Sequence, residues 1–594
     1  MFSCLSLMPA ILLLLPGCGG SGLGNGTSVV QTPPLAPSIA GVPDPPYVVT
    51  GSSAFQMTVL GSNFTSNSSV MEWNGTPLAT TYIATGPNSA QELSAQIPAS
   101  LVATPGTAQI SVKDNSSGVV SNTVVFAIVA PATAAAGVVQ LITIAPDGSA
   151  ANGDSLVAAS ISQTGRFIAF QSNATNLAPV PSGQQAEIFL RDTCIGVASG
   201  CTPSTQLVSV TYDGSTPTYP NRGSAVSADG RYVAFDSTAT NILPGLDYCY
   251  TLSSCVYLRD TCMGVASGCT PSTVLASVDT DGTLLGGANP TITPDGRFVS
   301  FNSTGATLGI NQIRVRDTCH GAPAGCTPGT SIYSLNIDGK PGNANSLYQQ
   351  VTPDGRFAAF ISYAGNLADP SNTASAGSQQ TFWVRDSCLG AAATCTPTTT
   401  REDLSSDGTP NDGNLDILAT GSISDNGRFV SFSTGYGSPN LTSQDVNGWG
   451  NVYWRDTCVN APAGCLPTTI LISLGNDGSI GNSTSHEQSI SGDGRYVVFT
   501  SIATNLVPFD NFPAGGWQEI YGRDTCVGAP SGCAPSTVRL AVTQGNPEAM
   551  GTYPSGFPVI SEDGHYVVFN SNSTNFVPTA KVQNAMVYLA KTGY

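Results

Sequence analysis

The nonapeptide Ser227-Ala228-Asp229-Gly230-Arg231-Tyr232-Val233-Ala234-Phe235 decides the fold, because its pattern recurs through most of the chain. An Asp-Gly pair is typical of a tight turn between two strands, and the alternating apolar residues that follow predict a strand. The glycine of the pattern recurs about every 66 residues, at Gly165, Gly230, Gly296, Gly355, Gly427, Gly494 and Gly564. The last copy carries His565 where the others carry arginine.

A second pattern follows each of the first six copies after about 25 residues. In the first unit it reads Phe189-Leu190-Arg191-Asp192-Thr193-Cys194, and a further apolar run, 206–210, comes after it. Each unit therefore predicts four short strands, and none shows the periodicity of a helix. Seven four-stranded units predict an all-β fold, a seven-bladed β-propeller over residues 137–594.

The two ends of the repeat region predict how the ring closes. The seventh unit stops at Val587-Tyr588-Leu589-Ala590, which matches a third strand and leaves no fourth. Before the first unit, Val139-Gln140-Leu141-Ile142-Thr143-Ile144 is followed by Asp147-Gly148 and matches a fourth strand. We expect this N-terminal strand to complete the last blade, because a split blade would otherwise leave an exposed edge.

The repeated Ser-x-Asp-Gly-Arg-Phe/Tyr pattern, followed by an apolar strand, resembles the WD40-like (PD40) repeats of TolB-type bacterial propellers. The resemblance covers about residues 137–594 and implies partners in the cell envelope. TolB's own partner-binding segment has no recognisable counterpart in this sequence. Propellers serve many functions, so the resemblance predicts the fold far better than the function.

Residues 36–130 have a different pattern of short alternating strands and polar turns, which predicts an immunoglobulin-like β-sandwich. The segments Gly61-Ser62-Asn63-Phe64, Trp73-Asn74-Gly75 and Gly106-Thr107-Ala108, in this order, resemble an IPT/TIG domain. In that family such modules serve mostly as spacers or adhesion units.

The first 18 residues contain the apolar run Ile11-Leu12-Leu13-Leu14-Leu15, which is too short to span a bilayer and predicts an export signal. Leu15-Pro16-Gly17-Cys18 resembles the lipobox of bacterial lipoproteins, which implies lipidation of Cys18. The family pattern has a lysine or arginine before the apolar run, and this sequence has none there. Plain secretion without lipidation is therefore the alternative. Residues 19–35 are rich in Gly, Ser and Pro and predict a flexible tether.

Fourteen of the sixteen cysteines lie in the repeat region and form seven close pairs. Six pairs are separated by six residues, whereas zinc ribbons place two to four residues between paired ligands. We therefore expect disulfides rather than metal sites, and an oxidising compartment outside the cytoplasm. The expected bonds are Cys194 with Cys201, Cys249 with Cys255, Cys262 with Cys269, Cys319 with Cys326, Cys388 with Cys395, Cys458 with Cys465, and Cys526 with Cys533.

Composition excludes several functions. The formal charge is −18, from 38 acidic and 20 basic residues, and such a surface repels nucleic acid. Only three histidines occur in the chain, which disfavours histidine-based metal sites and catalytic triads. No nucleophile elbow, zincin motif or P-loop is present, so we expect a protein without catalytic residues. Carboxylate pairs of the kind that cleave glycosides stay open as an alternative.

Twelve of the sixteen arginines occupy two repeat positions, and we expect them to pair with the repeated aspartates. A second set of aspartates follows the fourth strand of most units, at Asp147, Asp213, Asp281, Asp338, Asp407 and Asp477. These residues suit tight turns, or they form an acidic ring that attracts cations such as Ca²⁺. We expect no other cofactor or metal.

The loops between the second and third strands vary most between units, as ligand-binding loops do on rigid scaffolds. Their aromatic residues are Tyr248, Tyr250, Tyr436, Trp449, Phe509, Phe512 and Trp517. Aromatic side chains in such loops suit contacts with sugars or peptides, or they pack within their own loops.

These observations predict a monomeric, lipid-anchored protein of the bacterial envelope, at the outer membrane or cell surface. Its expected role is non-catalytic binding or scaffolding, with one propeller face as an interaction platform for protein or glycan. The alternative is a secreted propeller enzyme, a lyase or hydrolase that acts on polysaccharide.

Overall fold

The computed structural model describes most of the chain from residue 36 onward. The residues it does not describe are 1–35, 45–46, 50–53, 84–90, 105, 130–138, 181–185, 198–199, 247–248, 250–253, 266, 306–308, 323–324, 373–378, 417–421, 436–439, 445–447, 508–516, 530–531, 544–545, 579, 581–583 and 594. The predicted export signal, Cys18 and the tether therefore lie outside the described residues.

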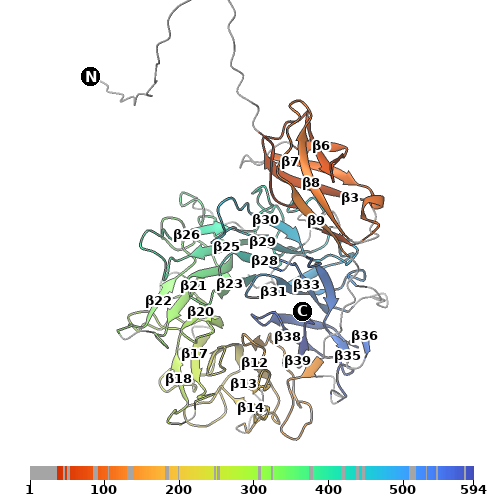
Figure 1. The fold of residues 1–594 in the computed structure, drawn as a ribbon. Coiled ribbons are helices and arrows are strands. Elements are labelled where there is room, and N and C mark those ends of the chain that lie inside the picture. The colour runs from red at the N-terminus through yellow and green to blue at the C-terminus, as the bar shows by residue number, and fades with distance from the viewer. Residues whose placement is uncertain are drawn as a thin grey trace, which may run out of the picture. The chain divides into compact units, whose positions relative to one another are not determined.

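Two sheets form the N-terminal β-sandwich. One has the order β1 (Ser38–Asp44), β3 (Phe55–Ser62), β7 (Gln91–Ile97) and β6 (Thr80–Ile83). The other has the order β2 (Tyr47–Val49), β9 (Val124–Val129), β8 (Gly106–Asp114), β4 (Ser69–Trp73) and β5 (Thr76–Pro77), and a short 3₁₀ turn spans Ala99–Val102. Met57, Leu93, Trp73 and Phe126 come from both sheets and are fully or almost fully buried in a common core. The predicted sandwich is therefore present as an independent hydrophobic unit (Figure 1).

Seven antiparallel four-stranded sheets form the blades of the propeller, each numbered by its place along the chain. Blade 1 contains β11 (Ser160–Ile161), β12 (Phe167–Ser172), β13 (Glu187–Asp192) and β14 (Ser204–Leu207). Blade 2 contains β15 (Asn221–Val226), β16 (Tyr232–Ser237), β17 (Cys255–Asp260) and β18 (Ser272–Leu275). Blade 3 contains β19 (Ala288–Ile292), β20 (Phe298–Ser303), β21 (Gln312–Asp317) and β22 (Gly329–Ile332).

The remaining blades follow the same plan. Blade 4 contains β23 (Ser346–Val351), β24 (Phe357–Ser362), β25 (Thr381–Asp386) and β26 (Thr398–Arg401). Blade 5 contains β27 (Ser422–Ile423), β28 (Phe429–Ser433), β29 (Val452–Asp456) and β30 (Thr468–Leu471). Blade 6 contains β31 (Ser485–Ile490), β32 (Tyr496–Ser501), β33 (Glu519–Asp524) and β34 (Ser536–Arg539). The strands of each blade are called A to D in chain order, and a hairpin that the sequence did not predict, β35 (Val542–Thr543) with β36 (Asn546–Met550), follows blade 6.

Blade 7 closes the ring with a strand from the other end of the repeat region. Its strands A to C are β37 (Ser555–Ile560), β38 (Tyr566–Ser571) and β39 (Met586–Lys591), and its strand D is β10 (Val139–Leu141). Val139 pairs with Ala590 and Leu141 with Tyr588 in antiparallel register. The predicted closure is confirmed, and the edge of β39 is covered by a strand from more than 400 residues earlier in the sequence.

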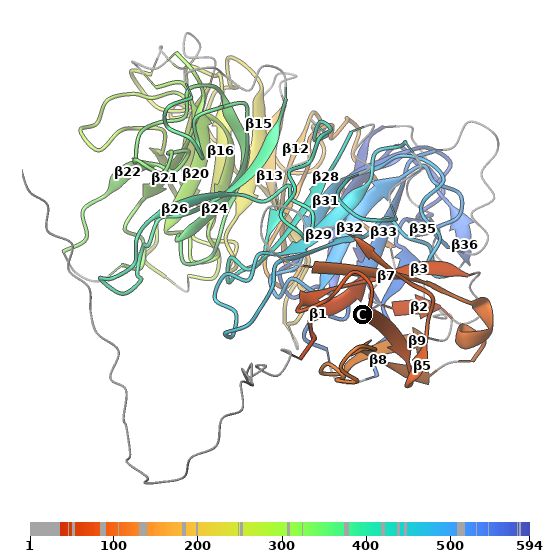
Figure 2. The ribbon, with the colours of Figure 1, turned by 90° about the horizontal axis from the view of Figure 1, so that it is seen from above.

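The recurring glycine explains how neighbouring blades fit together. Gly230 has φ +71°, and a Cβ atom there would lie 2.5 Å from the ring of Phe167 in the preceding blade. Only glycine allows this turn and this close approach. The same contact joins Gly165 to Tyr566, so the first blade packs against the last and the ring is continuous. Figure 1 shows the sheets around a common centre, and Figure 2 shows them after a rotation of 90°.

Strand direction divides the loops between two faces of the propeller. The repeat face carries the A–B turns and the C–D disulfide loops, such as residues 227–231 and 261–271 of blade 2. The variable face carries the B–C and D–A loops, such as residues 238–254 and 276–287. Among the described residues, no helix is long and apolar enough to cross a membrane.

All seven disulfides predicted from the cysteine spacing are present, which indicates an extracytoplasmic location. In blade 6, Cys533 forms its bond with Cys526, and the two Cα atoms lie 5.7 Å apart. The other bonds join Cys194 to Cys201, Cys249 to Cys255, Cys262 to Cys269, Cys319 to Cys326, Cys388 to Cys395, and Cys458 to Cys465.

Candidate functional site

The repeated arginines of the A–B turns hold the repeat face together. In blade 6, Arg495 donates through Nε and Nη2 to the two carboxylate oxygens of Asp524, at 2.8 and 2.6 Å. Asp524 also accepts a hydrogen bond from the backbone N–H of Cys526, at 2.7 Å, which fixes the start of the disulfide loop. The guanidinium group lies 4.8 Å from the centre of the Tyr496 ring. The same fork occurs in blades 1 to 5, so the predicted structural role of this arginine is supported.

The disulfide of each loop packs against this fork. Sγ of Cys533 lies 3.4 Å from Nη2 of Arg495 and 3.7 Å from Oδ2 of Asp524. A disulfide sulfur carries no proton, so Cys533 accepts a weak hydrogen bond from the guanidinium and only contacts the carboxylate. The arginine, the aspartate and the disulfide therefore form one structural unit at the end of the blade.

The second set of arginines joins neighbouring blades. Arg523 donates to Oγ1 of Thr537 in its own blade, at 2.5 Å, and to the carbonyl oxygen of Leu474 after blade 5, at 3.0 Å. Arg455 also pairs with Glu402, with Nε 3.1 Å from Oε2. Arg455 and Arg523 are buried between blades, and their hydrogen bonds give them a structural role.

The disulfide loops bring possible metal ligands together. In the part of the chain that the structure describes, sets of three potential ligand atoms include Asp192 with Cys194 and Cys201, and the equivalent residues of four further blades. Their sulfur atoms form disulfides and their aspartates bind the arginine forks. The chemistry of these groups therefore fits covalent cross-links and ion pairs, as the cysteine spacing predicted.

The aspartates that follow strand D cap their own turns. Asp477 accepts hydrogen bonds from the N–H and the hydroxyl of Ser479, at 2.9 and 2.6 Å. Asp147, Asp213 and Asp407 make equivalent bonds, and Asp281 binds the N–H of Thr283. Asp338 differs, because Asn336 caps that turn. This geometry supports the turn interpretation of these residues, while their charge still contributes to an acidic variable face.

Two of the predicted binding aromatics lie in described loops of the variable face. Trp449 and Trp517 are about 40% exposed, and the ring centre of Trp517 lies 5.8 Å from that of Tyr553. Tyr248, Tyr250, Tyr436, Phe509 and Phe512 lie outside the described residues. Both described tryptophans are therefore partly exposed, and Trp517 also packs on the ring of Tyr553.

A pocket of about 230 Å³ opens on the variable face between blades 6, 7 and 1. We call it the interblade pocket. Its lining comes from three parts of the sequence: residues 155–156, residues 487 and 518, and residues 554–557, 570–572 and 585. Leu156 and Phe557 are exposed at the pocket, and Gln518 directly follows Trp517.

Glu487 supplies the negative charge of the interblade pocket. Its Oε2 accepts hydrogen bonds from the backbone N–H of Phe557, at 2.9 Å, and from Nε2 of Gln518, at 3.1 Å. Burial raises the pKa of Glu487. Nδ1 of the neighbouring His486 lies 3.3 Å from Oδ2 of Asp416. Burial alone would lower the pKa of His486, but the Asp416 and Glu487 carboxylates raise it above its ordinary value.

The residues around Glu487 adopt an unusual backbone. Strand β31 shifts register between His486 and Ser489, and Glu487 in this bulge has φ +51°. Phe557 occupies the equivalent bulge of β37 with φ +54°. Asn289 and Tyr348 occupy the same bulge in blades 3 and 4, with φ +53° and +56°, so the bulge is a recurring feature of strand A. The bulges turn both side chains toward the interblade pocket, which they line.

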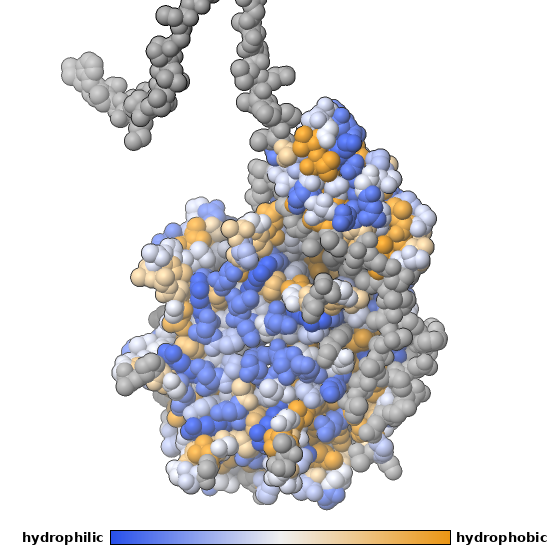
Figure 3. All heavy atoms as spheres, in the orientation of Figure 1, coloured by the Kyte–Doolittle hydropathy of each residue, from blue (hydrophilic) through white to orange (hydrophobic). Residues whose placement is uncertain are grey.

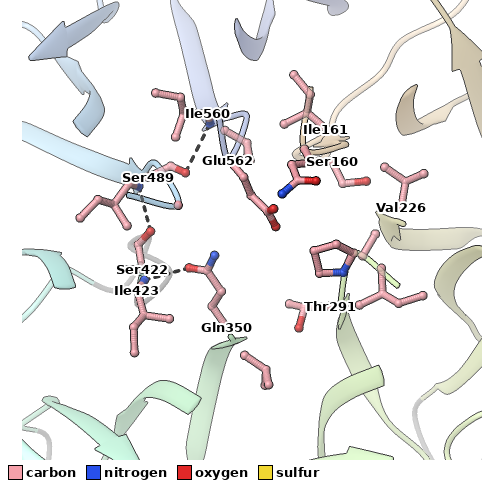
Figure 4. Close-up of a pocket in the computed structure, with 18 of the residues that line it drawn as sticks. Ser160, Ile161, Val226, Thr291, Gln350, Ser422, Ile423, Ser489, Ile560 and Glu562 are labelled. Carbon is pink, nitrogen blue, oxygen red and sulfur yellow. Dashed lines mark hydrogen bonds between the residues drawn. The ribbon is translucent and has the colours of Figure 1, made fainter. Parts of the chain in front are cut away.

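A second cavity, of about 270 Å³, lies on the propeller axis. Strand A of every blade lines it, with one residue from each blade labelled in Figure 4: Ser160, Val226, Thr291, Gln350, Ile423, Ser489 and Ile560. Side chains also link the A strands of neighbouring blades. Oε1 of Gln350 accepts a hydrogen bond from the N–H of Ile423, at 3.0 Å. Oγ of Ser489 accepts one from the N–H of Ile560, at 3.4 Å.

Two carboxylates line this axial cavity at the A–B turns of blades 5 and 7. Burial and the charges of Asp493 and Asp354 raise the pKa of Asp425 to about 6. Burial and the charge of Asp425 raise the pKa of Glu562 to about 7. The backbone of Gly492 connects the two turns, since it accepts from the Asp425 N–H at 2.8 Å and donates to the Glu562 carbonyl at 2.9 Å. Both carboxyl groups of the axial cavity therefore have pKa values above their ordinary range.

Sequence reasoning missed both acidic sites. Asp425 and Glu562 occupy the variable position of Ser-x-Asp-Gly, where the other units carry Gln, Ala, Pro or Gly. A comparison of the seven units at that position would have identified them. Glu487 lines the interblade pocket because of the bulge in β31, and the sequence pattern does not predict that bulge.

The surface of the propeller is largely polar. Figure 3 shows hydrophilic residues over much of the middle of the face seen in Figure 1, and hydrophobic residues closer to its edge. A hydrophilic surface around the axis agrees with the charged turns described above.

The chain has no match among protein-family models, and none among curated proteins. Among solved structures it is similar to prolyl oligopeptidase B from Galerina marginata, at 11% identity and a TM-score of 0.38, over 71% of this chain and 47% of that one. It is also similar to a hypothetical selenium-binding protein from Sulfolobus tokodaii, at 12% identity and a TM-score of 0.26, over 67% and 92% of the two chains. The chain spans about half the length of the oligopeptidase. These likenesses concern the fold alone, and the strand pairing itself establishes the seven-bladed propeller.

Proposed function

We propose that this chain is an exported, non-catalytic binding protein of the bacterial cell envelope, with the variable face as its interaction platform for a protein or a glycan. The repeat pattern, which resembles TolB-type propellers, supports an envelope role. The sandwich, which resembles an IPT/TIG module, serves as a spacer, and lipidation of Cys18 anchors the chain to a membrane.

One observation carries this proposal. Five aromatic side chains are strongly exposed in the described part of the chain, and all five lie on the variable face: Tyr212, Tyr219, Trp449, Trp517 and Phe557. Exposed aromatic rings provide large contact areas with little loss of side-chain entropy on binding. On the repeat face, by contrast, the aromatic ring of the turn in blades 1 to 6 lies under an arginine and against the glycine of the next blade.

Arrays of glycans and of peptides, probed with the full disulfide-bonded chain, test the proposal. The matched variants are Trp517→Ala on the variable face and Val265→Ala on the repeat face, since these side chains are 40% and 38% exposed. We expect Trp517→Ala to weaken binding of the selected ligand about tenfold and Val265→Ala to leave it unchanged. Equal effects of the two variants, or no ligand on either array, would count against the proposal.

A second candidate is a secreted enzyme that acts on polysaccharide, and the carboxylates of Asp425 and Glu562 in the axial cavity favour it. A raised pKa lets one carboxyl group act as a general acid while its partner stays ionised. A reducing-sugar assay on the same glycans separates the two candidates. New sugar ends that disappear in Glu562→Gln would support the enzyme, and binding without new ends would support the platform.

A further inference from the structure

We propose that the interblade pocket binds a basic side chain, the guanidinium of an arginine or the ammonium of a lysine, on a partner protein. The inference rests on the proposed function, because it names the class of partner for the same face.

Three buried polar atoms in the interblade pocket lack a partner within the described part of the chain. They are Oγ of Ser155, Oγ of Ser555 and Oδ1 of Asn570, in side chains that are 0%, 2% and 6% exposed. Nδ2 of Asn570 donates to the carbonyl oxygens of Ser155 and Val157, at 2.7 and 3.3 Å, so the amide oxygen is the atom left over. Unpaired buried polar atoms are costly, and three in one pocket indicate a polar ligand. The amide oxygen of Asn570 requires a donor from that ligand, whereas the two serine hydroxyl groups can accept or donate.

The charge of the pocket selects a cation among such ligands. Glu487 is the one charged side chain among the described residues that line it, and no basic residue lines it. His486 and Asp416 lie next to Glu487, and Asp154 accepts from the N–H of Ala585 at the pocket wall. The chain as a whole carries a formal charge of −18, which attracts a basic partner over long range.

The walls of the pocket suit a long side chain that ends in a charge. Phe557, Leu156 and Pro554 provide apolar surface for the methylene groups, and the paired rings of Trp517 and Tyr553 are next to Gln518 and Pro554 in sequence. A volume of about 230 Å³ accommodates one arginine or lysine side chain. Aromatic faces add cation–π attraction to the ion pair with Glu487.

A sugar fits the same pocket less well. The hydroxyl groups of Ser155 and Ser555 can serve a sugar or a cation, so the charge of the pocket decides between them. A neutral sugar would leave the carboxylate of Glu487, to which Nε2 of Gln518 already donates, without an opposite charge. The unpaired Oδ1 of Asn570 and the carboxylate of Glu487 are acceptors only, and they match the N–H groups of a cation. The observations therefore favour a protein partner over a glycan.

The test uses pairs of short peptides that differ at one position and carry no other charged side chain. One pair compares arginine with citrulline, and the other compares lysine with norleucine. Each pair is titrated against the full chain with its disulfides intact. We expect the arginine or lysine member to bind at least tenfold more tightly. Glu487→Gln keeps the shape of the side chain and should abolish this preference, whereas Asp412→Asn removes an exposed charge and should change it less than twofold.

Ser555→Ala provides a second variant in case Glu487→Gln does not fold, because it removes one unpaired hydroxyl and little else. We expect it to weaken the basic peptide about threefold. Equal binding of both members of a pair, no peptide binding, or oligosaccharide binding that depends on Glu487 would each overturn the proposal. Peptide or glycan binding that depends on Trp517 and not on Glu487 would overturn it and leave the proposed function intact.

Discussion

On the repeat face, one arrangement of arginine, aspartate and disulfide is copied from blade to blade, with almost every polar group paired. On the variable face, loops differ in length and sequence, and the interblade pocket contains unpaired polar atoms. Repetition of this kind follows from a packing requirement that every blade shares. Variation of loops on a rigid scaffold is typical of a surface selected for a ligand.

Reduction of the disulfides should have the largest effect, because six of the seven cross-link the repeat face. Each loop of this length contributes about 2.5 kcal/mol on the loop-entropy model, so full reduction removes more than ~10 kcal/mol, enough to unfold a typical domain. Thermal melts followed by circular dichroism, with and without a phosphine reductant, measure this. An unchanged melting temperature after complete reduction would show that the repeat face does not depend on its cross-links.

Asp524→Ala should have the largest effect of any single substitution proposed for either face. It removes both acceptors of the Arg495 fork and the cap on Cys526, and it leaves a half-buried guanidinium without its partner. We expect a loss of about 3 kcal/mol in the free energy of unfolding. Asp412→Ala, at an exposed position of the variable face, should cost less than about 0.5 kcal/mol in the same urea titration. Equal losses would remove the distinction between the faces.

Two carboxyl groups, Glu187 on the variable side and Asp260 on the repeat face, should respond to pH in opposite directions. On the variable side, burial raises the pKa of Glu187 to about 7. Its ionisation in the folded state costs stability as pH rises from about 4.5 to 7, so Glu187→Gln should gain about 2 kcal/mol above pH 7 and nothing below pH 4.

On the repeat face, burial would raise the pKa of Asp260, but the hydrogen bonds from Arg231 and from the Cys262 N–H, together with the charge of Arg231, lower it. The carboxylate therefore stabilises the fold above its unfolded pKa of 3.8, and this contribution disappears as pH falls through the lower folded value. Asp260→Asn should destabilise the chain at neutral pH and have no effect in strong acid. Unfolding titrations of both variants from pH 3 to 8 check the two signs, and parallel curves would contradict them.

Phe557→Gly should have the smallest effect on stability and the opposite sign. Phe557 is exposed and has φ +54°, a conformation that costs an ordinary side chain about 1 kcal/mol and glycine almost nothing. We expect the free energy of unfolding to rise by about 0.5 kcal/mol while binding to the variable face weakens several-fold. A variant that loses both stability and binding would show that the ring serves packing.

The repeat face could be predicted from the sequence far better than the variable face. Gly230, Arg231 and Tyr232 recur because one contact, glycine against the ring of the preceding blade, recurs, and repetition makes its residues visible. The same repetition predicts six of the seven disulfides and the closing strand 139–141. The interblade pocket combines residues near 155, 487 and 555, from three units far apart in the chain, and no single unit contains its pattern. The bulges that orient Glu487 and Phe557 are shifts of strand register, which alternation of apolar residues does not encode.

One crossed measurement tests the division between the two faces most directly. Asp524→Ala and Trp517→Ala are each assayed for the free energy of unfolding and for binding of the same array-selected ligand. The account predicts that Asp524→Ala loses about 3 kcal/mol of stability and, while folded, binds normally. It predicts that Trp517→Ala keeps its stability within about 0.5 kcal/mol and binds about tenfold more weakly. Weaker binding by folded Asp524→Ala, together with unchanged binding by Trp517→Ala, would contradict the assignment of function to the variable face.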